Sequence, residues 1–146
     1  MTPETAQPVW PSATPPPATT GPRWELGDLA QLPRVRAELR RYVAALPDAG
    51  PADADLRDQL VLALDEMASN ALRHAGGSRI VAAVDLTDDA YLIRVSDSAP
   101  AAPPAPAVGR DPSEGGLGLY LIAELATDHG WYAAGGRKHV WALLPR

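Results

Sequence analysis

The sequence contains no cysteine. Disulfide bonds and thiolate metal sites are therefore excluded. No apolar run is long enough to cross a bilayer, and the N-terminus has no apolar signal-peptide segment, so the cytoplasm is the expected compartment. Basic residues are also fewer than acidic ones, with 13 Lys and Arg against 18 Asp and Glu. The formal net charge is −5, whereas a protein that binds nucleic acid or an anionic membrane directly usually presents a basic patch, so neither is expected as a partner.

The chain has 146 residues, of which 46% are apolar, and this predicts one folded domain. Residues 1–22 are rich in proline, threonine and alanine. Proline fixes φ and removes a backbone donor, so this stretch is predicted to be a disordered tail, with a polyproline ligand as the alternative. The folded domain is expected over residues 23–146.

Hydrophobic periodicity predicts the elements of this domain. Helical spacing indicates helices over residues 32–46 and from Asp53 or Asp55 to Ala75. A third helix is expected to open at a glycine-rich start and to run to about Thr127, with Gly130 ending it. Alternating or apolar runs predict strands over residues 23–27, 79–86, 90–96, 131–133 and 138–144. This order predicts an α+β fold, a two-layer sandwich with helices on one face of a mixed, mostly antiparallel sheet.

Three places in the sequence carry groups suited to chemistry. Glu66 and Asn70 are four residues apart and so share one helix face, where a carboxylate and an amide oxygen can hold a hydroxyl group and a hydrated magnesium ion. Asp97 ends an apolar strand and can accept a hydrogen bond from an exocyclic amino group. Gly115, Gly116 and Gly118 surround the start of the third helix, where backbone N–H groups can approach an anion.

Each feature also has an ordinary explanation. The Glu66–Asn70 spacing is common on solvated helix faces, and an aspartate after a strand often forms a turn. The glycine-rich segment can be a plain helix entry after a loop. The connection over residues 98–115 is rich in proline and alanine, and its length is typical of a lid or mobile loop.

The three features together, in this order, resemble the Bergerat (GHKL, histidine-kinase-like) ATPase superfamily. Its N box is similar to residues 62–75 (LALDEMASNALRHA), its G1 box to residues 95–100 (VSDSAP), and its G2 box to residues 114–122 (EGGLGLYLI). The ending over residues 136–143 (GRKHVWAL) resembles the last strand of the branch of anti-sigma-factor serine/threonine kinases.

The resemblance implies a role for each matching residue. Glu66 would be the general base, Asn70 would ligate Mg²⁺, and Asp97 would bind the adenine amino group of ATP. The phosphates would lie against the loop formed by Gly115, Gly116, Leu117 and Gly118, beneath a lid over residues 98–115. The implied activity is phosphorylation of an antagonist protein, and the implied partners are that protein and a sigma factor. A homodimer is left open.

The sequence departs from the G1 box at two positions, because Ala99 and Ala101 replace its two glycines. These substitutions favour a second interpretation, a non-catalytic module that keeps the fold and acts by sequestering a protein. The intact Glu66 and Asn70 favour the kinase.

Overall fold

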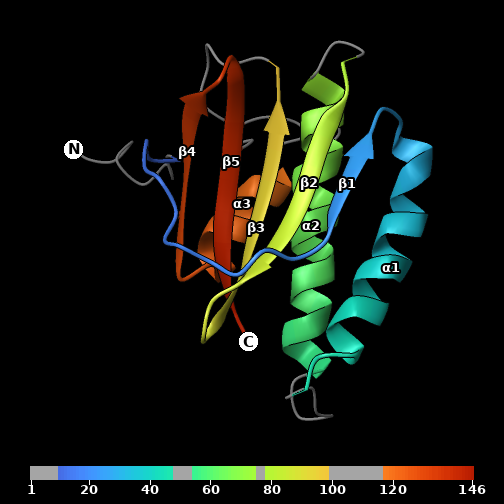
Figure 1. Ribbon diagram of the computed structural model, residues 1–146. Coiled ribbons are helices and arrows are strands. Elements are labelled where there is room, and N and C mark those ends of the chain that lie inside the picture. Colours follow the sequence, from blue (N-terminus) through green and yellow to red (C-terminus); the bar gives the residue numbers. More distant parts are fainter. Residues whose placement is uncertain (1–9, 48–53, 75–77, 99–116) are drawn as a thin grey trace.

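The computed structural model describes residues 10–47, 54–74, 78–98 and 117–146, which form one sheet and the helices packed on it (Figure 1). The strands are β1 (Arg23–Leu26), β2 (Ile80–Leu86), β3 (Ala90–Asp97), β4 (Asp128–Ala134) and β5 (Arg137–Pro145). The helices are α1 (Leu32–Ala44), α2 (Ala54–His74) and α3 (Leu117–Leu125), and a short 3-10 helix, η2 (Leu29–Gln31), precedes α1.

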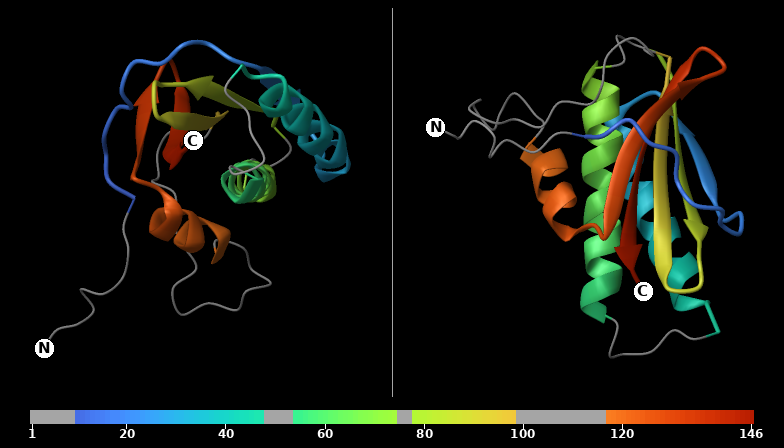
Figure 2. Two further views of the ribbon diagram at one scale, coloured as in Figure 1. Left: turned by 90° about the horizontal axis from the view of Figure 1, so that it is seen from below. Right: turned by 90° about the vertical axis from the view of Figure 1, so that its left-hand side faces the viewer.

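The sheet has the strand order β1-β2-β3-β5-β4, and each neighbouring pair of these strands is antiparallel. The helices lie on one side of it (Figure 2). The predicted α+β class, with helices on one face, is confirmed, and the pairing of the five strands is antiparallel throughout. None of the helices described is both long and apolar enough to cross a membrane.

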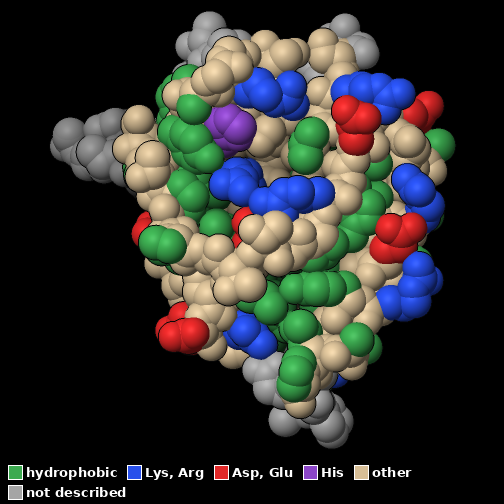
Figure 3. All heavy atoms as spheres, viewed as in Figure 1, with side chains coloured by type: hydrophobic (Ala, Val, Ile, Leu, Met, Phe, Trp, Pro, Cys, Tyr) green, Lys and Arg blue, Asp and Glu red, His purple; other side chains and the backbone are tan. Residues whose placement is uncertain are grey.

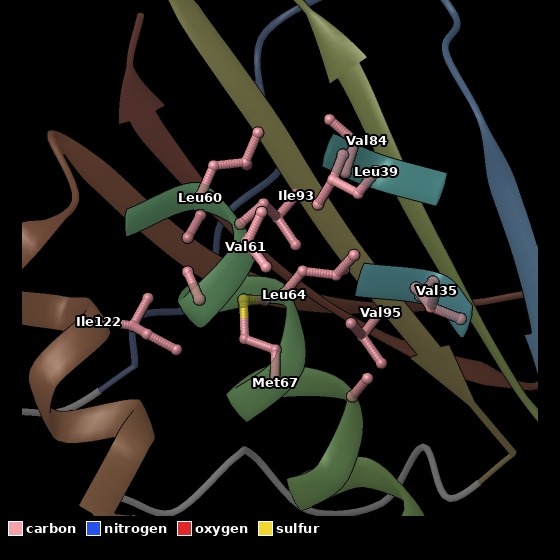
Figure 4. Close-up of a cluster of buried hydrophobic side chains, with 14 of the residues drawn as sticks. Val35, Leu39, Leu60, Val61, Leu64, Met67, Val84, Ile93, Val95 and Ile122 are labelled. Carbon is pink, nitrogen blue, oxygen red and sulfur yellow. The ribbon is translucent and has the colours of Figure 1, made fainter. Parts of the chain in front are cut away.

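The core lies between α2 and the inner face of the sheet. In β3, Ile93 and Val95 alternate with outward-facing residues and meet Leu64 and Met67 of α2, while Ile122 of α3 approaches from the side (Figure 4). This is the period-two alternation of a strand packed against the period-3.6 stripe of a helix. The predicted periodicities therefore place the apolar side chains on the facing surfaces.

Helix boundaries follow from local chemistry. Asp28 accepts a hydrogen bond from the Ala30 N–H, and Gln31 accepts one from the Asp28 N–H, which together form a capping box ahead of α1. Helix α1 ends at Ala44, shortly before Pro47, where the sequence predicted Leu46. Helix α2 matches its predicted extent within one residue.

One predicted boundary was wrong. The third helix was expected to run to about Thr127 and to be stopped by Gly130, but α3 ends at Leu125 and Gly130 lies inside β4. A Cβ atom on Gly130 would come within 3.0 Å of both the Pro11 carbonyl oxygen and the Trp141 ring. The glycine therefore permits a close approach within a strand.

The backbone that approaches Gly130 belongs to residues 10–22, here called the N-terminal arm. The arm pairs with β4 through Trp131, whose N–H donates to the Pro11 carbonyl at 2.9 Å and whose carbonyl accepts from the Ala13 N–H at 3.0 Å. It then crosses the face of the sheet opposite the helices (Figures 1 and 2). At the far side, Thr19 pairs with Leu86 of β2. The arm thus spans the sheet from β4 to β2.

This arrangement corrects the prediction of a disordered tail for residues 10–22, whereas residues 1–9 lie outside the described part of the chain. Proline does exclude regular structure from the arm, but tertiary contacts fix it instead. Trp10 is only 2% exposed and belongs to the hydrophobic core. The Trp141 indole N–H donates to the Ala13 carbonyl at 2.8 Å, and the Gly21 N–H donates to Asp85 Oδ1 at 2.9 Å.

Removal of the Trp10 side chain tests whether the arm is part of the folded unit. Trp10→Ala is expected to lower the free energy of unfolding by about 3–5 kcal/mol, because it leaves a cavity at a buried aromatic position. Urea denaturation followed by circular dichroism measures the change. Thr20→Ala, at an exposed arm position, is the control, with an expected change within about 0.5 kcal/mol. Equal stability of Trp10→Ala and wild type would show that the arm adds nothing to the core.

Candidate functional site

The connectivity brings the candidate residues to one end of the sheet. Strand β2 begins next to the end of β3, since Val81 pairs with Ser96, and α2 precedes β2 by only a few residues. The C-terminal ends of α2 and β3 therefore lie together. Helix α3 ends shortly before β4, whose start pairs with Leu143 at the other end of the sheet. The first turn of α3 is therefore the end of this helix that lies nearer to the end of β3 (Figure 2).

Helix α2 presents Glu66 and Asn70 beside its buried stripe. Met67 and Ala71 are buried in the core, whereas Glu66 and Asn70 are each half-buried. Residues four apart lie one above the other on a helix, so the carboxylate and the amide share a face. The structure therefore places both side chains on one face of α2.

The amide oxygen of Asn70 is the most informative atom at this end of the sheet. Its Oδ1 is buried and has no hydrogen-bond partner among the described residues. A buried acceptor without a partner costs about 1–3 kcal/mol. Its neighbour Ser69, by contrast, satisfies its hydroxyl by donating to the Glu66 carbonyl at 3.2 Å. The Asn70 oxygen can therefore accept a hydrogen bond from a ligand or coordinate a cation.

Asp97 ends β3 with its side chain on the helix-facing side. Its neighbours two and four residues earlier, Val95 and Ile93, belong to the core, and alternate residues of a strand share a face. Asp97 is only 4% exposed, and the Nζ atom of Lys138 lies 3.9 Å from its Oδ2. The carboxylate is thus buried and partly compensated by a cation.

Lys138 was not singled out from the sequence. It reaches Asp97 because β5 pairs with β3, in a register that sets the two residues side by side. The two strands are separated along the chain by α3 and β4, so no local pattern indicates the contact. Only the strand order of the sheet could have revealed it.

The glycine-rich segment is described in part. Helix α3 begins at Leu117, which places Leu117 and Gly118 in its first turn, as the prediction of a glycine-rich helix start requires. Gly115, Gly116 and residues 99–114 of the expected lid lie outside the described residues. The first turn of a helix has unpaired N–H groups and a partial positive charge, and α3 packs against α2 and β5.

These residues fit a magnesium–nucleotide complex better than a metal held by protein alone. In the described ranges, no group of three or more His, Asp or Glu side chains gathers at a metal-binding distance. Mg²⁺ usually keeps several waters and takes one or two protein oxygens together with substrate phosphates. The unpaired Asn70 oxygen can supply such a ligand, and the buried Asp97 can accept from an amino group.

Comparison with protein families gives an independent result. Residues 29–143 match the histidine kinase-like ATPase domain, and this span covers most of the chain. This span includes Glu66 and Asn70 of α2, Asp97 of β3 and the start of α3. No curated protein matches the chain. The family match implies an ATP-binding domain of the GHKL type.

The unpaired oxygen of Asn70 predicts an unusual response to mutation. Asn70→Ala is expected to raise the free energy of unfolding of the ligand-free protein by about 1 kcal/mol, because it removes a desolvated acceptor and improves helix propensity. Chemical denaturation without nucleotide or magnesium measures this. Ser69→Ala is the matched control on the same helix, and it should gain less because it also removes a satisfied hydrogen bond. A loss of stability in Asn70→Ala would mean that the oxygen has a structural partner.

Proposed function

The chain belongs to the histidine kinase-like ATPase family, and we propose on that basis that it is a protein serine/threonine kinase that phosphorylates an antagonist protein and so controls the availability of a sigma factor. The observation that supports this most is the buried Oδ1 of Asn70, which has no hydrogen-bond partner in the part of the chain that the structure describes. It lies one helical turn beyond Glu66 and at the same end of the sheet as Asp97.

In this proposal the chain holds ATP at three points. Asp97 accepts a hydrogen bond from the adenine amino group, Asn70 ligates Mg²⁺, and the phosphates bind the backbone at Gly115, Gly116, Leu117 and Gly118. ATP, when bound, supplies the phosphoryl group. The protein contributes mainly alignment and charge compensation, which dominate catalysis of phosphoryl transfer.

Glu66 is proposed to act as the general base. It lies one turn before Asn70 on the same face, half-buried, so its carboxylate can orient an incoming hydroxyl group and accept its proton. Because this contact is made to the hydroxyl group and not to the nucleotide, Glu66 contributes to transfer more than to nucleotide binding.

A non-catalytic module that sequesters its partner is the second candidate. Asp97 already lies beside Lys138 inside the protein, so adenine must bind next to an existing ion pair. The alanines that replace the two G1-box glycines, Ala99 and Ala101, favour the same alternative. Both candidates act on a sigma factor or its antagonist, which operate in the cytoplasm, and both allow a homodimer.

The role of Asp97 is tested in a background that already lacks Lys138, its charge partner, so that the two variants compared differ only in the carboxylate. We expect Mg-ADP to bind the double variant Asp97→Ala/Lys138→Ala more weakly than Lys138→Ala by about 1–3 kcal/mol, the cost of leaving the adenine amino group unpaired. Isothermal titration calorimetry measures both affinities. Equal affinity of the two variants would remove Asp97 from the nucleotide site.

The role of Glu66 is tested by separating binding from transfer. Glu66→Gln should lower the rate of phosphoryl transfer by about 10²–10⁴-fold and leave the affinity for Mg-ATP nearly unchanged. Transfer is measured from radiolabelled ATP to candidate antagonist proteins. Glu25→Gln, at an exposed position of β1, is the matched control and should transfer at the wild-type rate.

Two results would count against this assignment. Transfer by Glu66→Gln at the wild-type rate would rule out the general base. Wild-type protein that binds an antagonist and Mg-ATP but transfers no phosphate would favour the sequestration module.

A further inference from the structure

The sheet face opposite the helices carries an unusual concentration of positive charge. Arginine side chains and a histidine gather near the middle of this face (Figure 3). They come from three strands, since Arg23 belongs to β1, Arg94 to β3, and Arg137 and His139 to β5. The chain as a whole has a net charge of −5, so this patch runs against the overall balance.

These side chains surround a hollow, here called the outer-face hollow. It has a volume of about 290 Å³, and its polar lining comprises Arg23, Arg94, Arg137, His139, Ser96 and Tyr132. A neighbouring hollow of about 420 Å³ shares Arg23, Arg94 and Tyr132 and continues beneath residues 14–18 of the N-terminal arm. The arm therefore forms part of the surrounding wall.

The cations outnumber the acids that compensate them. Among the described residues that line the two hollows, Asp85 is the acidic one. Its buried carboxylate accepts from Arg23 at 2.9 Å and from Arg94 at 3.4 Å. Arg137 donates to the Ser96 carbonyl at 3.1 Å and forms no ion pair with a carboxylate of the described residues. Two guanidinium groups thus share the Asp85 carboxylate, and the third, that of Arg137, pairs with no carboxylate of the described residues.

A structural role accounts for only part of this arrangement. Asp85 also accepts from the Gly21 N–H, so its pairing with Arg23 fixes the arm to β2. Arg94 meets Asp85 only at 3.4 Å and is 25% exposed at the side chain. Arg137 pairs with no buried carboxylate of the described residues, and Arg94 adds a longer contact to a carboxylate that Arg23 already pairs. Both arginines line the same hollow.

We propose that the outer-face hollow binds a phosphate group. Guanidinium groups offer paired N–H donors in a geometry that suits phosphate oxygens. The hydroxyl group of Tyr132 lies in the same lining and can add a neutral donor. Because Arg94 and Ser96 point away from the helices, this site is separate from the proposed nucleotide site on the inner face.

His139 gives the site a measurable pH dependence. Burial lowers the pKa of His139, and the positive charges of Arg94 and Arg137 lower it further, against opposing effects of the Ala134 carbonyl and Asp97. The groups packed around its ring are the Ser96 hydroxyl at 2.6 Å and the stacked ring of Tyr132. A bound anion would offset the positive field and raise the pKa of His139.

The primary experiment titrates inorganic phosphate into the full chain by isothermal titration calorimetry. Arg94→Gln and Arg137→Gln should each weaken binding by about tenfold, the loss of one charge-assisted hydrogen bond. Arg40→Gln is the matched control, because Arg40 lies on α1 with an exposed side chain and pairs with Asp58. Its affinity for phosphate should equal that of wild type. Phosphate affinity unchanged in both hollow variants would overturn the proposal.

A competition experiment separates the two faces of the sheet. Saturating Mg-ADP should leave the phosphate affinity of the outer-face hollow unchanged. Loss of phosphate binding in the presence of Mg-ADP would place the anion at the nucleotide site and overturn the proposal.

Phosphoserine in place of inorganic phosphate tests the source of the group: tighter binding indicates a phosphorylated side chain, and equal binding indicates free phosphate.

The pH dependence is measured with sulfate, which stays a dianion across the range in which histidine titrates. Binding that raises the pKa of His139 takes up protons, so sulfate affinity should increase as the pH falls from about 8 to 6. His139→Gln should bind with a flatter pH profile. An identical pH profile in His139→Gln and wild type would exclude an anion close to this ring.

Discussion

The packing of α2 on the inner face of β3 is the contact on which the rest of the structure depends. Leu64 and Met67 lie against Ile93 and Val95, and this contact fixes the rotation of the helix about its axis. Once the apolar stripe is buried, the adjacent face of the helix must carry Glu66 and Asn70 at the edge of the core. The position of the candidate site is therefore a consequence of core packing.

Much of this arrangement could be predicted from the sequence because it rests on local periodicity. The stripe of α2, the alternation in β3 and the glycine-rich start of α3 are each readable within a single segment. The α+β class then follows from the order of the elements. What periodicity does not show is burial of a particular atom: the unpaired Oδ1 of Asn70 and the 4% exposure of Asp97 depend on segments packed from elsewhere in the chain.

The parts that the sequence did not indicate depend on contacts between distant segments. Proline content correctly excluded helix and strand from residues 10–22, but a segment without regular structure can still be held by tertiary hydrogen bonds. Trp10 in the core and Trp141 bonded to the Ala13 carbonyl hold the arm in this way. One local signal was Gly130, because a glycine inside a strand often marks a close backbone approach.

At the end of β3, two neighbouring residues face opposite sides of the sheet. Asp97 faces the helices beside Lys138, whereas Ser96 faces outward and meets His139 at 2.6 Å. In β5 the partners follow the same alternation, since Ser96 pairs with His139 and Asp97 with Lys138. A side chain can thus be changed on one face without removing a contact on the other. Any ligand that displaces this end of the β3–β5 ladder must, however, move groups on both faces, because they share one backbone.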